Sequence, residues 1–272
     1  MTANQIPETA HSPVMAPESG IIAVLPAAGK ATRLGSIPCS KEILPLAPLR
    51  PGSFNPAPGS RVVIEDALHM LGECGVDSAL IVTAPEKTDI CAYLGAGPVG
   101  GVELGFLVCE DSPSVPHTLR SAVSEAGNRD MLLWFPDIVA EPRTLIRTLI
   151  ADHRKSAADI SLALVPSDRG EKVDIVSVDS SGSVLDIRPK PGKGISGWTW
   201  VAGLWSATFS AFLDRFVQSS GEAGREIYVG DVINAARRSH FIVQSVNFSS
   251  GRALDIGTPE DLARLWTDAS RT

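Results

Sequence analysis

The sequence predicts a three-layer α/β protein, in which helices cover both faces of a mostly parallel sheet. The first reason is that short apolar segments of strand length alternate with amphipathic segments of helix length from residue 21 to residue 165. This βαβα order is typical of a parallel sheet between helices. The second reason is a run of small residues directly after the first apolar segment, because ligands of such sheets bind where strands end.

The elements of the first half follow this alternation. The first predicted strand covers residues 21–25, whose unbroken apolar run indicates burial on both faces. Residues 47–60 are rich in proline and glycine and predict a surface loop. We then expect helices over 61–75, 85–94, 116–126 and 143–155, and strands over 78–83, 104–109, 131–135 and 159–165.

The pattern changes after Pro166. Residues 173–178 and 183–188 read as short strands on either side of the turn at 179–182, which predicts a hairpin. Further along the chain, we expect strands over 199–206 and 240–246 and helices over 208–217, 226–238 and 259–269. No linker composition divides the chain, so we expect residues 20–272 to form a single domain.

Composition limits the classes of function. A net charge of −7 argues against binding to nucleic acid or to an anionic membrane, so an anionic substrate has to meet a local group of cations. No apolar run reaches the roughly 18 residues of a membrane span. The four cysteines lack CxxC spacing, which favours reduced thiols in the cytoplasm over a zinc site. Residues 1–19 are expected to be a disordered tail and not a signal peptide.

The segment after the first strand is the strongest candidate for a phosphate site. Its small residues allow main-chain N–H groups to approach an anion closely, and Arg33 and Lys41 add cations. We expect the nucleotide cradle to consist of Pro26, Ala27, Ala28, Gly29, Lys30, Ala31 and Thr32. A plain βα turn is the alternative, since neither GxxxxGK[ST] nor GxGxxG is present.

Two aspartates are candidates for binding a metal ion. Asp137 directly follows a predicted buried strand, where the ligands of open α/β sheets bind. Asp255, which shortly precedes the last predicted helix, is the second candidate only because of the family resemblance given below. The alternative for Asp137 is an Asx turn or a helix cap, and Asp255 has the same alternative of capping a helix.

Four stretches are similar to motifs of the sugar-1-phosphate nucleotidyltransferases, which include the glucose-1-phosphate thymidylyl- and uridylyltransferases. They are LPAAGKATRL (25–34), SKEILPL (40–46), FPDI (135–138) and DIGTPE (255–260). In the first of them, Ala31 replaces the second glycine of the family's G-x-G-T-R pattern. The resemblance runs from about residue 21 to residue 265. It implies the Rossmann-like nucleotide-diphospho-sugar transferase type of fold, with a small β-rich extension for the sugar.

This resemblance also implies how the chain is divided. The nucleotide-binding part covers about residues 20–165, the sugar-binding part about 166–258, and the terminal helix 259–269. The implied reaction transfers a nucleotidyl group from a nucleoside triphosphate to a sugar-1-phosphate and releases pyrophosphate. We expect a cytoplasmic homo-oligomer, a dimer or a tetramer, with no nucleic acid or membrane partner.

The resemblance assigns roles to four catalytic residues, Arg33, Lys41, Asp137 and Lys190. Arg33 and Lys41 would hold the triphosphate. Asp137 and Asp255 would share one Mg²⁺, an ion that takes few carboxylates and completes its shell with phosphate oxygens. Lys190 matches the lysine of the family's E-K-P motif, which binds the sugar phosphate.

Further residues are implied for the base and the sugar. Glu110 falls where the family has a glutamine that reads the pyrimidine, and His117 is the other nucleotide-binding residue. Because an ionised carboxylate only accepts hydrogen bonds, Glu110 favours UTP or dTTP, then GTP, over CTP. Lys190, Trp200, Gly203 and Asp174 are expected to bind the sugar, although Pro189 replaces the family's glutamate.

Two other functions remain open at this point. One is a guanylyl- or cytidylyltransferase of the same fold that acts on another phosphorylated small molecule. The other is a non-catalytic regulatory subunit that senses a nucleotide sugar. The second function is disfavoured because a binding module has no need of the metal carboxylates, whereas this chain has all five charged residues implied by the resemblance: Arg33, Lys41, Asp137, Asp255 and Lys190.

Overall fold

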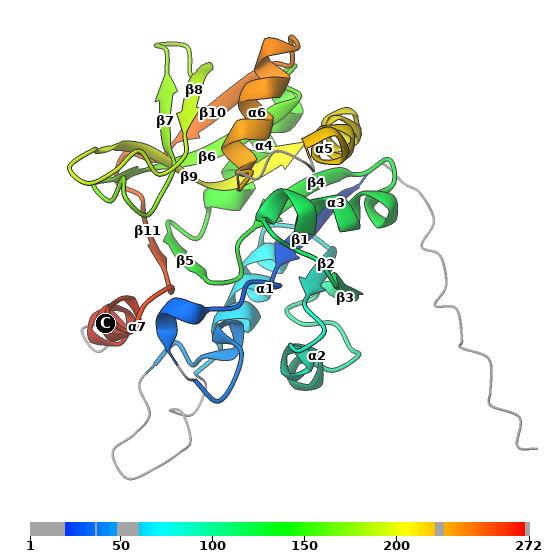
Figure 1. Cartoon of the computed structure of the whole chain (residues 1–272), viewed down its shortest axis with the longest axis vertical. Helices are drawn as coiled ribbons and strands as arrows, with labels where there is room; N and C mark the ends of the chain where they lie inside the picture. Colours follow the sequence, from blue (N-terminus) through cyan, green and yellow to red (C-terminus); the bar gives the residue numbers. More distant parts are fainter. Residues whose placement is uncertain (1–19, 36, 48–59, 221–225, 270–272) are drawn as a thin grey trace, which may run out of the picture.

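Residues 20–35, 37–47, 60–220 and 226–269 are described in a computed structural model of the chain (Figure 1). The tail predicted for residues 1–19 and most of the loop predicted for 47–60 lie outside these residues. The main feature is a nine-stranded mixed sheet. Seven of its strands follow the order β10-β6-β9-β4-β1-β2-β3, and β7 and β8 complete it as a hairpin attached at β9. Among the described residues, no helix has the length and apolar character of a membrane span.

The first half of the chain forms the parallel part of the sheet, as predicted. Its strands are β1 (Ile21–Pro26), β2 (Ser78–Thr83), β3 (Glu103–Val108) and β4 (Asp130–Trp134). β1 lies between β2 and β4 and runs parallel to both, and β3 continues the sheet beyond β2. The helices of this half are α1 (Val63–Glu73), α2 (Thr88–Leu94), α3 (Val115–Ala126) and α4 (Leu145–Lys155).

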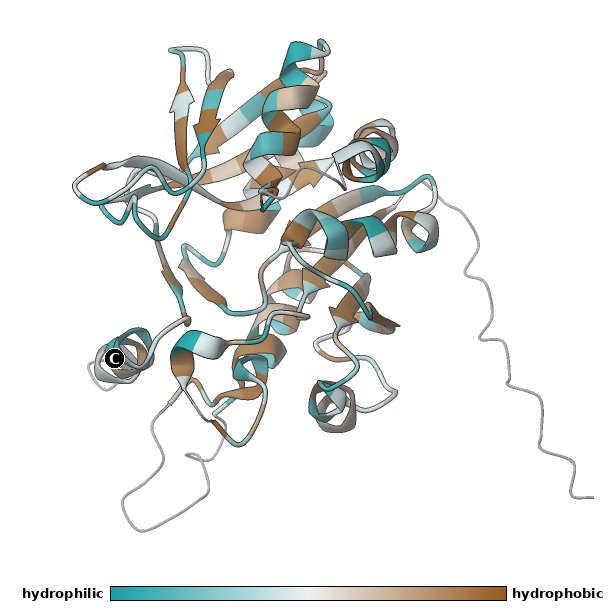
Figure 2. Ribbon diagram, viewed as in Figure 1, coloured by the Kyte–Doolittle hydropathy of each residue, from teal (hydrophilic) through white to brown (hydrophobic). Residues whose placement is uncertain are grey.

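Side chains of β1 alternate between two hydrophobic cores, one on each face of the sheet. Ala23 and Leu25 face a core that includes residues of α1 and α4, whereas Ile22 and Val24 face a core that includes residues of α3. This alternation follows from the two-residue period of a strand. Figure 2 shows the result, since the central strands are coloured mainly as hydrophobic. The continuous apolar run of this segment therefore reflects burial on both faces, as expected.

The second half completes the same sheet. Its strands are β6 (Ile160–Ser167), β7 (Ile175–Val178), β8 (Val184–Arg188), β9 (Gly197–Trp205) and β10 (Val243–Asn247). β9 runs antiparallel between β4 and β6 and so joins the two halves. The helices α5 (Ala207–Ser220) and α6 (Val229–Arg238) cover the same face as α3. The predicted hairpin is confirmed, with β7 and β8 paired antiparallel.

A second, two-stranded sheet was not predicted. It pairs β5 (Ile138–Glu141) with β11 (Arg252–Asp255) in antiparallel register, just before α7 (Pro259–Ala269). Strands of four residues have too short a pattern to be recognised alone. The pairing matters because it brings the chain after Asp137 beside Asp255, and the Ile256 N–H donates to the Asp137 carbonyl at 2.9 Å.

Several predicted boundaries were wrong by two or three residues. The helices expected from residues 61, 85, 143 and 226 begin at Val63, Thr88, Leu145 and Val229, and the strand expected from 240 begins at Val243. For α1 the reason is tertiary. Val62 is extended and forms a bridge with Pro45, so the helix starts one residue later.

Candidate active site

A cleft of about 900 Å³ lies where four parallel strands end. Residues that follow β1, β2, β3 and β4 all contribute to its walls, as expected for an open α/β sheet. The cleft brings together ten of the predicted site residues: Pro26, Ala28, Gly29, Lys30, Ala31, Thr32, Arg33, Lys41, Glu110 and Asp137. Residues separated by up to about a hundred positions in the chain therefore meet at one place.

The cradle keeps a left-handed backbone at the position where the resembling family has glycine. Ala31 has φ 51° and ψ 29° and directly precedes the short 3₁₀ helix η1 (Thr32–Leu34). This conformation costs an alanine about 1–2 kcal/mol, because its Cβ crowds the following carbonyl oxygen. Lys30, Thr32 and Arg33 are exposed. The chain thus has a left-handed backbone at the position where alanine replaces the glycine of the resembling pattern.

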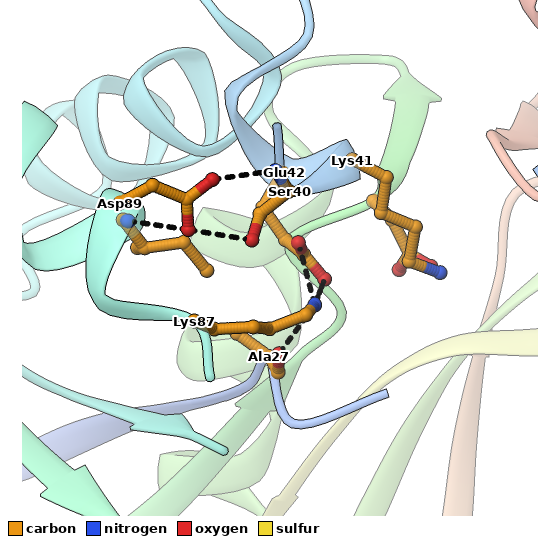
Figure 3. A network of polar contacts seen from close by, with 8 residues as sticks. Ala27, Ser40, Lys41, Glu42, Lys87 and Asp89 are labelled. Carbon is orange, nitrogen blue, oxygen red and sulfur yellow. Dashed lines mark hydrogen bonds and ion pairs between the residues drawn. The ribbon is translucent and has the colours of Figure 1, made fainter. Parts of the chain in front are cut away.

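Ala27 is the one predicted cradle residue that does not line the cleft. It is fully buried, and its carbonyl oxygen accepts a hydrogen bond of 2.7 Å from Lys87 Nζ. Lys87 was not predicted from the sequence. It also forms an ion pair with Glu42, at 2.9 Å to both carboxylate oxygens (Figure 3).

Lys41 and the two aspartates form the charged centre of the site. Lys41 lies in the 3₁₀ helix η2 (Lys41–Ile43), and its Nζ forms an ion pair with Asp137 Oδ2. Both side chains are only 14% exposed. Burial works against the charge of Lys41, but the neighbouring Asp137 outweighs it and raises the pKa of the lysine. Lys41 therefore stays charged at neutral pH.

Asp255 lies close to this ion pair, and its surroundings disfavour its ionised form. Burial and then the charge of Asp137 raise the pKa of Asp255. Its Oδ1 atom is buried and has no hydrogen-bond partner among the described residues. A bound cation would reduce the repulsion between the two carboxylates and give the unpaired oxygen a partner.

These two carboxylates fit Mg²⁺ better than a metal with an all-protein shell. Among the described residues, no group of three or more His, Cys, Asp or Glu side chains is placed to hold an ion. Mg²⁺ is commonly bound by one or two carboxylates together with substrate phosphates. Arg33 and Asp255 both lie beside Gly257, where a Cβ would come within 3.2 Å of Arg33 Nη2 and 3.3 Å of Asp255 Oδ1. A glycine at this position thus leaves room for both charged groups.

The predicted base-recognition residues lie at one wall of the cleft. Glu110 follows β3 and lines the cleft. His117 lies in the first turn of α3 and is not among the lining residues; its Nδ1 is hydrogen-bonded to Ser114 Oγ at 2.8 Å. The roles of Glu110 and His117 in reading the base stay predictions.

Lys190 does not line the cleft and is connected to it only through two intermediate residues. It has φ 41°, and its Nζ lies 4.5 Å from the centroid of the Tyr228 ring. The Tyr228 hydroxyl donates to Glu226 Oε2 at 2.7 Å, and Glu226 lines the cleft. Tyr228 was not predicted as a site residue, because a single tyrosine near the start of a predicted helix carries no recognisable pattern.

Asp174 and Trp200 form a second connection to the cleft. Trp200 Nε1 donates to Asp174 Oδ2 at 3.1 Å, and the Trp200 ring lies 5.5 Å from that of Phe135, which lines the cleft. Burial is the main cause that raises the pKa of Asp174. Gly203 lies in β9, where a Cβ would come within 2.9 Å of the Trp205 ring, so its position makes room for that ring. Its predicted role toward a sugar stays a prediction.

Comparisons with known proteins identify the fold. No protein-family model matches the sequence, and no curated protein matches it either. Solved structures do match. One is a Bacillus anthracis protein described as a glucose-1-phosphate thymidylyltransferase, in complex with sucrose, with a TM-score of 0.78 at 19% identity. The match covers 93% of this chain and 96% of that one.

Two UDP-glucose pyrophosphorylases are similar to a comparable degree. One is complexed with UDP-glucose and has a TM-score of 0.76 at 14% identity, covering 93% of this chain and 99% of that one. The other, from Acinetobacter baumannii, has a TM-score of 0.74 at 18% identity, covering 92% of this chain and 93% of that one. The chain therefore has the three-layer, Rossmann-like fold of the sugar-1-phosphate nucleotidyltransferases.

Proposed function

We propose that the protein is a Mg²⁺-dependent nucleotidyltransferase that joins a nucleoside monophosphate unit to a sugar-1-phosphate. The observation that carries the proposal is that most of the cradle, Arg33, Lys41 and Asp137 line one cleft, with Asp255 close to the Lys41–Asp137 ion pair. A plain βα turn does not require two cations together with two carboxylates that repel each other. The solved structures of the same fold support the class of reaction.

In the proposed reaction, an oxygen of the sugar phosphate attacks the α-phosphorus of the triphosphate in line. A new oxygen–phosphorus bond forms, the bond from the α-phosphorus to the bridging oxygen breaks, and pyrophosphate leaves with that oxygen. The attacking phosphate is already ionised, so no protein base is required. Catalysis then depends on positioning and on neutralising charge.

The residues divide this work between the two substrates. Main-chain N–H groups of the cradle, with Arg33 and Lys41, would hold the triphosphate and stabilise the leaving pyrophosphate. Asp137 and Asp255 would hold Mg²⁺, which when bound supplies positive charge to the phosphate oxygens. Lys190 would hold the sugar phosphate, and its contact with the Tyr228 ring would limit the directions in which its ammonium group can point.

For the nucleotide, we propose UTP or dTTP, followed by GTP. Glu110 lines the cleft, and its ionised carboxylate can accept a hydrogen bond from the N3–H of uracil or thymine. The N3 of cytosine and the N1 of adenine are acceptors and would face the carboxylate unfavourably. One solved structure of this fold, from Acinetobacter baumannii, is described as UTP-bound, which is consistent with this order.

The proposal is tested by measuring pyrophosphate release with each nucleoside triphosphate, a panel of sugar-1-phosphates and Mg²⁺. We expect turnover with UTP or dTTP, and a Glu110→Gln variant that accepts CTP better than the wild type does. Efficient turnover with CTP alone would contradict the proposed base recognition. If no triphosphate is consumed while a nucleotide sugar binds in calorimetry, the protein is a sensing subunit and not an enzyme.

A further inference from the structure

We propose that the segment at the start of α2, residues 87–89, positions Lys41 for catalysis by anchoring the residues on both sides of it. This inference rests on the proposed role of Lys41 at the leaving pyrophosphate. Lys87 and Asp89 are neither in the cradle nor near the metal carboxylates in sequence. The structure nevertheless connects them to the two chain neighbours of Lys41, Ser40 and Glu42 (Figure 3).

The residue before Lys41 is held by Asp89. The Ser40 main-chain N–H donates to Asp89 Oδ2 at 2.6 Å, and the Ser40 hydroxyl donates to Asp89 Oδ1 at 2.7 Å. Burial works against the charge of Asp89, but these donors outweigh it and lower the pKa of the carboxyl. Asp89 is therefore ionised at neutral pH and accepts two hydrogen bonds from a single residue.

The residue after Lys41 is held by Lys87. Both oxygens of Glu42 accept from Lys87 Nζ at 2.9 Å, and the Glu42 side chain is only 1% exposed. A buried ion pair is weak evidence for stability, because a well-packed apolar pair is often no less stable. The Lys87–Glu42 pair does restrict the position of Glu42, because both charges keep their partners only in a narrow range of geometries.

Lys41 needs such support because its own helix provides little. The 3₁₀ helix η2 is three residues long, and only two hydrogen bonds close it, from Ile43 N–H to the Ser40 carbonyl and from Leu44 N–H to the Lys41 carbonyl. Short 3₁₀ turns have poor hydrogen-bond geometry and little stability of their own. With both neighbours anchored, the Lys41 side chain extends on the other side of η2, toward Asp137.

Lys87 also connects this arrangement to the cradle. Besides the two oxygens of Glu42, its Nζ contacts the carbonyl oxygen of Ala27, the second residue of the cradle. One ammonium group thus fixes the cradle and the turn that carries Lys41 relative to each other. The triphosphate would have to contact both parts at once, so their separation sets the geometry of binding.

The experiment is a double-mutant cycle read out by calorimetric affinity for UTP and dTTP, which does not require turnover. Asp89→Ala and Glu42→Gln each remove one anchor, and Lys41→Met removes the group they are proposed to position. We expect each anchor variant to weaken triphosphate binding about fivefold to tenfold in the wild type and less than about twofold in the Lys41→Met background. Tyr93→Phe is the matched control, because it removes an exposed hydrogen bond from α2 to Glu65 that involves neither Lys41 nor its chain neighbours.

The outcomes separate the anchoring from the proposed function. If the anchor variants weaken binding equally in both backgrounds, or not at all in the wild type, Lys41 is not positioned by residues 87–89. If Lys41→Met binds and turns over every triphosphate like the wild type, the proposed role of Lys41 itself fails. Should Glu42→Gln not fold, as judged by circular dichroism, Asp89→Ala and Ser40→Ala decide the question alone. Ser40→Ala should show the same coupling with a smaller effect, because one of the two contacts to Asp89 remains.

Discussion

The two lysines assigned to phosphate groups are held in different ways. Lys41, in the proposed nucleotide half, forms an ion pair with Asp137, and both of its chain neighbours are anchored by charged side chains of one segment. Lys190, in the proposed sugar half, has a left-handed backbone and lies over the Tyr228 ring. Lys41 is thus surrounded by directional charge pairs, whereas Lys190 combines an unusual backbone conformation with an aromatic surface.

This difference indicates where substrate choice can change. When one member of a network of paired charges is substituted, several other groups lose their partners, so substitutions in such a network are costly in stability. An aromatic surface tolerates exchange of the groups around it more readily. The sequence agrees, since Pro189 replaces a family glutamate next to Lys190, whereas the charged residues expected at the triphosphate are all present.

The largest effect is expected from Asp137 and Asp255, the two carboxylates that we propose to hold Mg²⁺. Asp137→Asn and Asp255→Asn should each lower kcat by roughly 10²–10³-fold, because a neutral amide is a poor ligand for Mg²⁺ and charge at the transferring phosphate is less well neutralised. The measurement is pyrophosphate release over a Mg²⁺ titration, with circular dichroism to verify the fold. Asp152→Asn, at an exposed position of α4, is the control. Near-normal turnover at saturating Mg²⁺ in either variant would remove that residue from the metal site.

A smaller and more selective effect is expected for Lys190, which we propose to hold the sugar phosphate. Lys190→Ala should raise KM for the sugar phosphate by about 10–100-fold, which corresponds to about 1.5–3 kcal/mol for a hydrogen bond to a charged group. Affinity for the triphosphate should be unchanged in calorimetry. The control is Lys193→Ala, an exposed lysine of the same loop. If triphosphate affinity falls instead, the assignments of Lys190 and Lys41 have to be exchanged.

The contacts of α7 with the segment that follows β6 give a prediction on stability. Asp261 in α7 accepts from Arg169 Nη2 at 2.7 Å and from Thr258 Oγ1 at 2.8 Å, and its side chain is 6% exposed. Burial opposes its charge, but the hydrogen bonds from Arg169 and Thr258 outweigh it and lower the pKa of Asp261. Asp261→Asn should therefore lower the free energy of unfolding by about 1–3 kcal/mol at pH 7.

The pH dependence of this loss has a definite sign. Because the folded pKa lies below the unfolded value of about 3.9, the stabilisation is complete above that value and is lost as the pH falls through the folded pKa. The difference in unfolding free energy between wild type and variant should shrink below about pH 4. Denaturant titrations at pH 7 and pH 3.5 test this, and a constant difference would mean that Asp261 does not act through its charge.

The smallest effect is expected in the cradle. Ala31→Gly should raise the free energy of unfolding by about 0.5–1 kcal/mol, because relief of the left-handed alanine exceeds the entropy that glycine loses on folding. Ala28→Gly is the control and should be destabilising by about 0.5–1 kcal/mol, since Ala28 does not have a positive φ. A loss of stability in Ala31→Gly would show that the alanine contributes packing that outweighs its strain.

The sequence by itself determined the class of fold and the order of its main elements. The four parallel strands of the first half and the β7–β8 hairpin were predicted from apolar runs and turn residues, because these signals are local. The cradle, Lys41, Asp137 and Asp255 were predicted as site residues from motifs, and these roles stay predictions. Each of these signals lies within a few consecutive residues.

Only the tertiary structure decided how these parts meet. The β5–β11 pairing, which joins residues more than a hundred positions apart, brings Asp255 to Asp137, and no pattern of four residues predicts such a partner. Lys87 and Asp89 likewise look like ordinary surface charges in the sequence. A charged residue is recognised as buried and paired only when its partner is known, because burial of a charge depends on contacts that the local sequence does not contain.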